Sequence, residues 1–187
     1  MPLSRILLDS NAYFRLAQSI RPLLGAPFGK KKYCLFVLKE LQIEYDRSPR
    51  LKGVFYWVND PEYKDNRSNV LEVTREEKRE IQRAYDCILD YVRNVHPDVS
   101  KVDVRCLAYA EQLCIPVVTD DEEMRQAAEE YDIKTLNTLE LLKVMLDAKH
   151  IDMVKVREIV GYLEYQHDMP RIIKKDYKKI FGEDPPK

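Results

Sequence analysis

Short apolar runs alternate with longer segments of helical periodicity through most of this chain. The apolar runs predict strands at residues 5–8, 33–36, 115–119 and 133–136, of which 115–119 (IPVVT) is the richest in β-branched residues. The segments with helical spacing predict helices at 11–20, from 37 onward, 51–58, 74–94, 100–113, 122–131 and 139–148. Strands that alternate with helices in this way predict an α/β fold built on a parallel sheet.

Turn-forming residues mark the breaks between these elements. Residues 21–32 (RPLLGAPFGKKK) hold two Pro and two Gly and predict a loop with a basic end, and residues 59–73 predict a second, exposed loop. Thr74 with Glu77 three positions later has the spacing of a capping box, which predicts the start of a helix.

The last part of the chain reads as an appendage to this pattern. We predict one domain over residues 1–148 and a helical extension with a basic tail over 149–187. Apolar residues recur at helical spacing through 151–166, and RIIKKDYKKIFG and EDPPK complete the sequence. Our hypothesis is that the apolar face of 151–163 packs on its own domain, and a homodimer contact is the alternative.

The composition excludes several classes of protein. At 187 residues and 45% hydrophobic content, the chain is long and apolar enough to fold around a core without a disulfide or a metal. Its 31 basic and 32 acidic residues exclude a strongly cationic nucleic-acid binder but permit a local basic patch. No apolar run reaches the roughly 18 residues of a membrane span, and the charged N-terminal segment lacks the cleavage site of a signal peptide.

The cysteines indicate the cellular compartment. Cys34, Cys87, Cys106 and Cys114 show no Cys-x-x-Cys or Cys/His ligand spacing. This pattern predicts buried, reduced thiols in a cytoplasmic protein and does not favour a zinc site.

Acidic residues follow two of the predicted strands. Asp9 comes directly after residues 5–8, and Asp120 and Asp121 come after 115–119. Ligands of open α/β sheets bind at the carboxyl ends of the strands, so these acids are candidates for a shared site. The alternative is that each acid only caps the helix that follows it.

Two further acids have equally ordinary alternatives. Asp103 lies three residues after Ser100, which is capping-box spacing. Glu40 lies in FVLKELQIEY, where it is either a site residue or a solvated helix glutamate. What decides the matter is whether all these acids point to one place.

Four motifs, in order, resemble the PIN domain, a nuclease family that includes the VapC-type toxins. These are ILLDSNAYFRL, FVLKELQIEY, SKVDVRCLAYAEQLCIPVVTDDEEM and IKTLNTLELLKVM, and together they span roughly residues 4–146. The third is the most distinctive, because an Asp opens an Ala-rich helix that leads through a turn and a strand to Thr-x-Asp. The resemblance implies a three-layer fold with a short parallel sheet between helices.

The resemblance also implies a site of catalytic carboxylates. These are Asp9, Glu40, Asp103 and Asp121, with Asn11 and Thr119 as polar supports. Asp120 departs from the family pattern and is a ligand, a support or an exposed bystander. Clustered carboxylates need a cation to neutralise them, and oxygen ligands select Mg²⁺ or Mn²⁺. We expect Asp9 and Asp121 to bind the metal directly, and Asp103 and Glu40 to hold metal-bound water or a second ion.

Substrate binding requires local positive charge. Residues 28–52 hold 7 Lys/Arg against 3 acids, a net charge of +4. We predict phosphate contacts from Lys30, Lys31, Lys32, Arg105 and Arg125, and Arg15 is a further candidate. The alternative is that these are solvated surface charges.

The function that these features predict is a metal-dependent endoribonuclease acting on single-stranded RNA. The family resemblance adds the toxin of a toxin–antitoxin pair, with an antitoxin partner, as its setting. A response-regulator receiver would have paired acids after its first strand, and a haloacid-dehalogenase phosphatase would have Asp-x-Asp there, whereas this chain has Asp-Ser-Asn. A non-catalytic PIN-like binding module is the alternative, and no motif separates RNA from DNA as the substrate.

Overall fold

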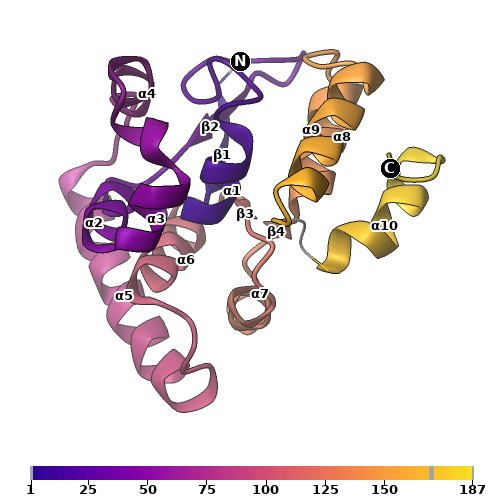
Figure 1. The fold of residues 1–187 in the computed structure, drawn as a ribbon. Helices are drawn as coiled ribbons and strands as arrows, with labels where there is room; N and C mark the ends of the chain where they lie inside the picture. The colour runs from indigo at the N-terminus through magenta and orange to yellow at the C-terminus, as the bar shows by residue number, and fades with distance from the viewer. Residues whose placement is uncertain (1, 169–170, 187) are drawn as a thin grey trace.

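The computed structural model describes residues 2–168 and 171–186, and its centre is a four-stranded sheet (Figure 1). The strands are β1 (Ser4–Leu8), β2 (Tyr33–Phe36), β3 (Val117–Val118) and β4 (Thr135–Leu136). They run parallel in the order β2-β1-β3-β4, with Leu7 of β1 aligned with Phe36 on one side and Val117 on the other. The α/β class and the parallel sheet predicted from the sequence are confirmed.

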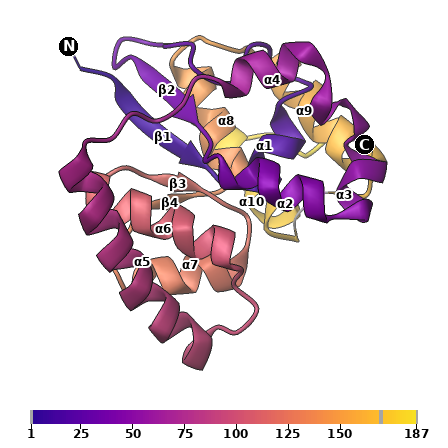
Figure 2. The ribbon, with the colours of Figure 1, turned by 90° about the vertical axis from the view of Figure 1, so that its left-hand side faces the viewer.

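Alternate residues of each strand pack against opposite layers of helices. Ile6, Leu8 and Val118 belong to one core, and Leu7 and Val117 belong to the other. This is the period-2 alternation of a strand that is buried on both faces. Figure 2 shows helices α5, α6 and α7 on one side of the strands and α1, α8 and α9 on the other, so the fold has three layers.

The helices of the first half are short. They are α1 (Ser10–Leu16), α2 (Glu40–Arg47), α3 (Pro49–Val54), the 3₁₀ helix η1 (Tyr56–Asn59) and α4 (Pro61–Arg67). The presence of α4 corrects the prediction of a loop over 59–73. Its residues are mostly polar, but Pro61 suits a first helical turn, and the buried ring of Tyr63 lies 4.4 Å from that of Trp57.

The helices of the second half follow the predictions closely. They are α5 (Arg75–Val95), α6 (Lys101–Leu113), α7 (Glu122–Glu129) and α8 (Thr138–Asp147). The capping boxes predicted at the starts of α5 and α6 are both formed. Strand β3 is shorter than the predicted strand 115–119, because parallel pairing with β1 and β4 involves only Val117 and Val118.

The C-terminal helices α9 (Met153–Tyr165) and α10 (Arg171–Phe181) pack on the rest of the chain. Val156, Ile159, Val160 and Leu163 of α9 are buried in the same core as β1 and α1, as is Tyr177 of α10. The apolar face of α9 therefore packs on its own chain, as hypothesised.

This packing predicts a specific pattern of mutational cost on α9. Ile159 is 1% exposed and Val154 is 58% exposed on the same helix. We expect Ile159→Ala to lower the free energy of unfolding by about 2–5 kcal/mol through a lost side chain and a residual cavity. Val154→Ala should change it by less than about 0.5 kcal/mol. Urea denaturation measures both, and equal small losses would contradict the packing of α9.

The cysteines depart in part from the sequence prediction. All four are free thiols, and Cys34 and Cys106 are buried, but Cys87 and Cys114 are exposed. Cys87 lies on α5 with its Sγ 3.9 Å from the Tyr131 hydroxyl, and Cys114 ends α6 in a left-handed conformation, with φ 50°. Within the described residues, no helix is both long enough and apolar enough to cross a membrane.

Candidate active site

The strand order has a topological switch point between β1 and β3. These two strands are neighbours, but the chain leaves β1 toward β2 on one side of the sheet and leaves β3 toward β4 on the other. Open α/β sheets bind ligands outside the carboxyl ends of the strands at such a switch point. Asp9 and Thr119 stand there, since the Asp9 N–H donates to the Val118 carbonyl at 3.0 Å and the Thr119 N–H to that of Leu136 at 2.9 Å.

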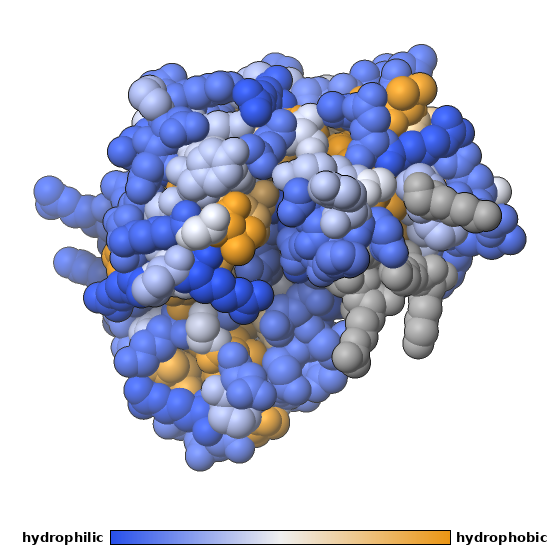
Figure 3. All heavy atoms as spheres, in the orientation of Figure 1, coloured by the Kyte–Doolittle hydropathy of each residue, from blue (hydrophilic) through white to orange (hydrophobic). Residues whose placement is uncertain are grey.

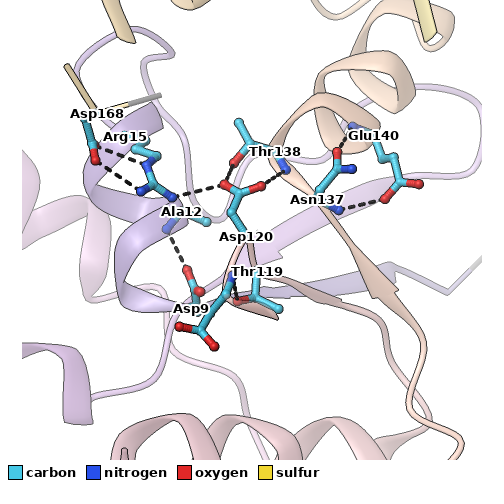
Figure 4. A network of polar contacts seen from close by, with 10 residues as sticks. Asp9, Ala12, Arg15, Thr119, Asp120, Asn137, Thr138, Glu140 and Asp168 are labelled. Carbon is cyan, nitrogen blue, oxygen red and sulfur yellow. Dashed lines mark hydrogen bonds and ion pairs between the residues drawn. The ribbon is translucent and has the colours of Figure 1, made fainter. Parts of the chain in front are cut away.

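Asp9 is a buried N-cap of α1. It is 4% exposed, and its Oδ1 accepts a hydrogen bond from the Ala12 backbone N–H at 2.6 Å (Figure 4). Burial raises the pKa of Asp9 to about 7, against the effect of hydrogen bonds from Thr119 and Ala12. The negative charges of Asp103 and Asp120 raise this pKa further, so other carboxylates lie within electrostatic reach of Asp9.

Asp121 and Asp103 also serve as caps. Oδ1 of Asp121, the exposed N-cap of α7, accepts from the Met124 N–H at 2.7 Å. Asp103 forms the α6 capping box, and its Oδ2 accepts from the Ser100 N–H at 3.1 Å. Burial raises the pKa of Asp103, and the charges of Glu44 and Asp121 add to the shift. Three helix starts therefore bring three aspartates to one region.

Helix α2 brings two glutamates to the same region. Burial raises the pKa of the Cys106 thiol, and the charges of Asp9, Asp103 and Glu40 raise it further, so Glu40 acts on the same thiol as the two aspartates. Glu44 accepts a hydrogen bond from Ser10 Oγ at 2.6 Å, next to Asp9 in sequence. Sequence reasoning missed Glu44, although its place one helical turn after Glu40 puts both on one face of α2.

Asp120 has a different environment from its neighbour Asp121. Its side chain is 2% exposed, and it pairs with Arg15 Nη1 at 3.0 Å. It also accepts from the Thr138 backbone N–H at 2.9 Å and from the Thr138 hydroxyl. Of the three roles considered for Asp120, these contacts agree with a buried support that ties α1 to the start of α8.

The polar supports predicted with the carboxylates lie in contrasting places. Thr119 is fully buried, and its Oγ1 accepts from the Asp121 backbone N–H at 3.1 Å. Asn11 is exposed on α1 and faces a groove between helices. Thr119 is thus part of the acidic site, whereas Asn11 borders it.

The lysines that were predicted to contact phosphates lie at the opposite end of the sheet from the acidic residues. Ser4 at the start of β1 donates its N–H to the Lys32 carbonyl at 3.0 Å, and Ser4 is aligned with Tyr33. Lys30, Lys31 and Lys32 therefore lie at the amino ends of the strands, near the level of Ser4, which is five residues or about 16 Å from Asp9 at 3.3 Å per residue. Because the strands are parallel, these lysines do not line the acidic site, and their contacts with substrate phosphates stay a prediction.

The two predicted arginines have different surroundings. The Arg105 guanidinium lies 3.7 Å from the Tyr85 ring centroid and donates to Gln82 at 2.9 Å. It also lies 4.0 Å from Glu40 Oε1, at the border of the acidic region. Arg125 on α7 is half-buried, and its Nη1 has no hydrogen-bond partner among the described residues.

The donor set has the chemistry of a hard-cation site. Asp9, Asp103 and Asp121 offer only oxygen ligands, which suits Mg²⁺ or Mn²⁺, and each uses one oxygen for a helix cap. Over residues 2–168 and 171–186, no three His, Cys, Asp or Glu side chains are grouped closely enough to hold a metal ion. The residue types fit a metal, and the side chains are not gathered into a finished coordination sphere.

Comparisons with known proteins assign no family. No family model matches the chain, and no curated protein matches it. A solved structure described as "Crystal Structure of FitAcB from Neisseria gonorrhoeae" aligns with a TM-score of 0.44 and 17% identity, over 72% of this chain and 98% of that one.

Proposed function

We propose that this protein is a metal-dependent nuclease that hydrolyses phosphodiester bonds of single-stranded RNA. The observation that carries the proposal is that Asp9 and Asp121 cap the helices that follow the neighbouring strands β1 and β3. Asp103, in the capping box of a third helix, is within electrostatic reach of both. Acids that repel one another at the carboxyl edge of a parallel sheet favour a role in binding a cation.

Each acidic residue has a part in this proposal. Asp9, Asp103 and Asp121 would hold Mg²⁺ or Mn²⁺, which when bound polarises a phosphodiester and activates water. The helix caps fix one oxygen of each aspartate, and the other oxygen would be the metal ligand. Glu40 and Glu44 border the site on α2, where Ser10 holds Glu44 in place.

Cleavage of RNA tests the proposal directly. A labelled single-stranded RNA, and a DNA of the same sequence, would be incubated with Mn²⁺, with Mg²⁺ and with EDTA. We expect RNA fragments that depend on the metal and disappear with EDTA. No cleavage of either polymer under any condition would favour the alternative of a non-catalytic binding module.

Metal binding provides a readout that does not depend on activity. A ligand present at 100 times its Kd stabilises the folded state by about 2.7 kcal/mol. We therefore expect Mn²⁺ to raise the melting temperature of the wild-type protein, measured by differential scanning fluorimetry. The Asp9→Asn/Asp121→Asn variant should show no such rise, and an equal rise in both proteins would place the metal elsewhere.

The biological setting rests on the sequence motifs. The resemblance to PIN domains implies a toxin with an antitoxin partner, and both stay predictions, as do a homodimer and a cytoplasmic location. Induced expression of the wild type and of Asp9→Asn/Asp121→Asn in a bacterial host tests the first of them. A toxin of this kind should arrest growth only when its carboxylates are intact.

A further inference from the structure

A groove of about 280 Å³ lies between helices α1, α3 and α9. Its walls include Asn11, Arg15 and Gln18 from α1, Arg50 from α3, and Tyr162 from α9. Figure 1 shows α1 between these two helices, and Figure 3 views the same side of the molecule, where hydrophilic side chains predominate and hydrophobic ones form small patches. Polar and apolar groups thus line the groove together.

The groove continues from the acidic site along one face of α1. Asn11, Arg15 and Gln18 are spaced four and three residues apart, so they share that face. Asn11 is two residues from Asp9, and the charge of Asp9 contributes to the raised pKa of Arg15. A polymer held at the carboxylates and extending past Asn11 would enter this groove.

The charges in the groove are unevenly compensated. Arg15 binds both oxygens of Asp168 at 3.1 Å, through Nε and Nη2, and also pairs with Asp120. Arg50 is exposed and has no acidic partner among the described residues. Arg15 is therefore occupied by two carboxylates, whereas the guanidinium of Arg50 can bind a ligand.

An aromatic ring forms part of the opposite wall. Tyr162 is 41% exposed, and its hydroxyl lies 3.4 Å from Gln18 Oε1. This contact keeps the ring at the groove and leaves part of it open to solvent. Proteins bind single-stranded nucleic acids by stacking bases on exposed aromatic rings and by contacting phosphates with basic side chains. Tyr162 and Arg50 supply one group of each kind.

We propose that this groove binds the single-stranded polynucleotide next to the bond that is cut. The inference rests on the proposed function and adds a binding subsite to it. Arg50 contacts a backbone phosphate, Tyr162 stacks on a base, and the amides of Asn11 and Gln18 hydrogen-bond to nucleotide edges. A free guanidinium and several amides favour a polyanionic strand over an apolar peptide.

Binding without cleavage isolates this subsite. In EDTA, fluorescence anisotropy of a short labelled single-stranded RNA reports affinity while hydrolysis is absent. We expect Arg50→Glu to weaken binding by about tenfold, the scale of one charge-assisted hydrogen bond. Arg47→Glu is the matched control, since this exposed arginine ends α2 outside the groove and undergoes the same change of charge. Arg47→Glu should change affinity by less than about twofold.

The stacking contact has its own matched pair. Tyr162→Ala should weaken binding by about tenfold, as loss of one base stack does. Tyr165→Ala should leave it nearly unchanged, although Tyr165 is 79% exposed on the same helix, because it does not line the groove. Equal effects within both pairs would overturn the proposal and indicate non-specific surface binding.

The failure of this inference differs from the failure of the proposed function. If the wild type cuts RNA and the groove variants bind like their controls, the strand follows another path and the nuclease stands. If no RNA is cut but Arg50→Glu and Tyr162→Ala weaken binding selectively, the groove binds nucleic acid in a non-catalytic module.

Discussion

Replacing both Asp9 and Asp121 by asparagine is expected to lower RNA cleavage by at least about a hundredfold. Loss of groups that merely support metal ligands costs about 10–100-fold, so loss of two direct ligands should cost at least as much. Asparagine is also a good N-cap, because its side-chain oxygen accepts the same hydrogen bonds from the Ala12 and Met124 N–H groups. The variant should therefore keep its fold and lose the charges that bind the cation.

A second double variant controls for net charge. Asp98→Asn/Glu129→Gln also removes two negative charges, and both of these acids are exposed and are not among the predicted carboxylates. We expect its rate of cleavage to stay within about twofold of the wild type, in keeping with the small effects of surface substitutions. Circular dichroism and urea denaturation establish that both variants are folded. Cleavage that survives in Asp9→Asn/Asp121→Asn would mean that another site or another enzyme cuts the RNA.

Capping a helix and standing at a shared edge of the sheet were alternatives in the sequence, and in the structure Asp9 and Asp121 do both. Asp9 and Asp121 each cap a helix and each stand at the carboxyl end of the sheet. The reason is geometric, because in an α/β fold the helix that follows a strand begins at the carboxyl end of that strand. A cap there is already at the ligand-binding edge. Residue type and spacing predicted the cap, and only the order β2-β1-β3-β4 shows that the two caps are neighbours.

The information that the sequence lacked was tertiary. It did not show that the run Lys30–Lys32, which precedes β2, lies at the opposite end of the sheet from the acids that follow β1 and β3. Helix α4 was predicted as a loop because its polar sequence hides the single anchoring ring of Tyr63. Glu44 was missed because its hydrogen bond to Ser10 joins residues 34 positions apart.

The pH dependence of stability should reveal the buried carboxylate of Asp9. Its pKa is raised to about 7 in the folded protein, from about 3.8 in an unfolded chain, mainly by burial. The folded state then holds a proton that the unfolded chain has released, so this contribution to stability is complete below pH 4 and lost as pH rises through about 7. The shift corresponds to roughly 4 kcal/mol, since one pKa unit is about 1.4 kcal/mol.

Comparison with Asp9→Asn isolates this effect from all other titrating groups. Asparagine does not titrate, so the variant's free energy of unfolding relative to the wild type should rise by roughly 4 kcal/mol between about pH 4 and pH 8. Urea denaturation in EDTA across this range measures the difference. A difference between Asp9→Asn and the wild type that does not change with pH would contradict the raised pKa of Asp9. An increase of this difference with pH would show that ionisation of Asp9 destabilises the folded protein in the absence of a metal. A buried carboxylate whose charge is neutralised only by a bound cation should behave in this way.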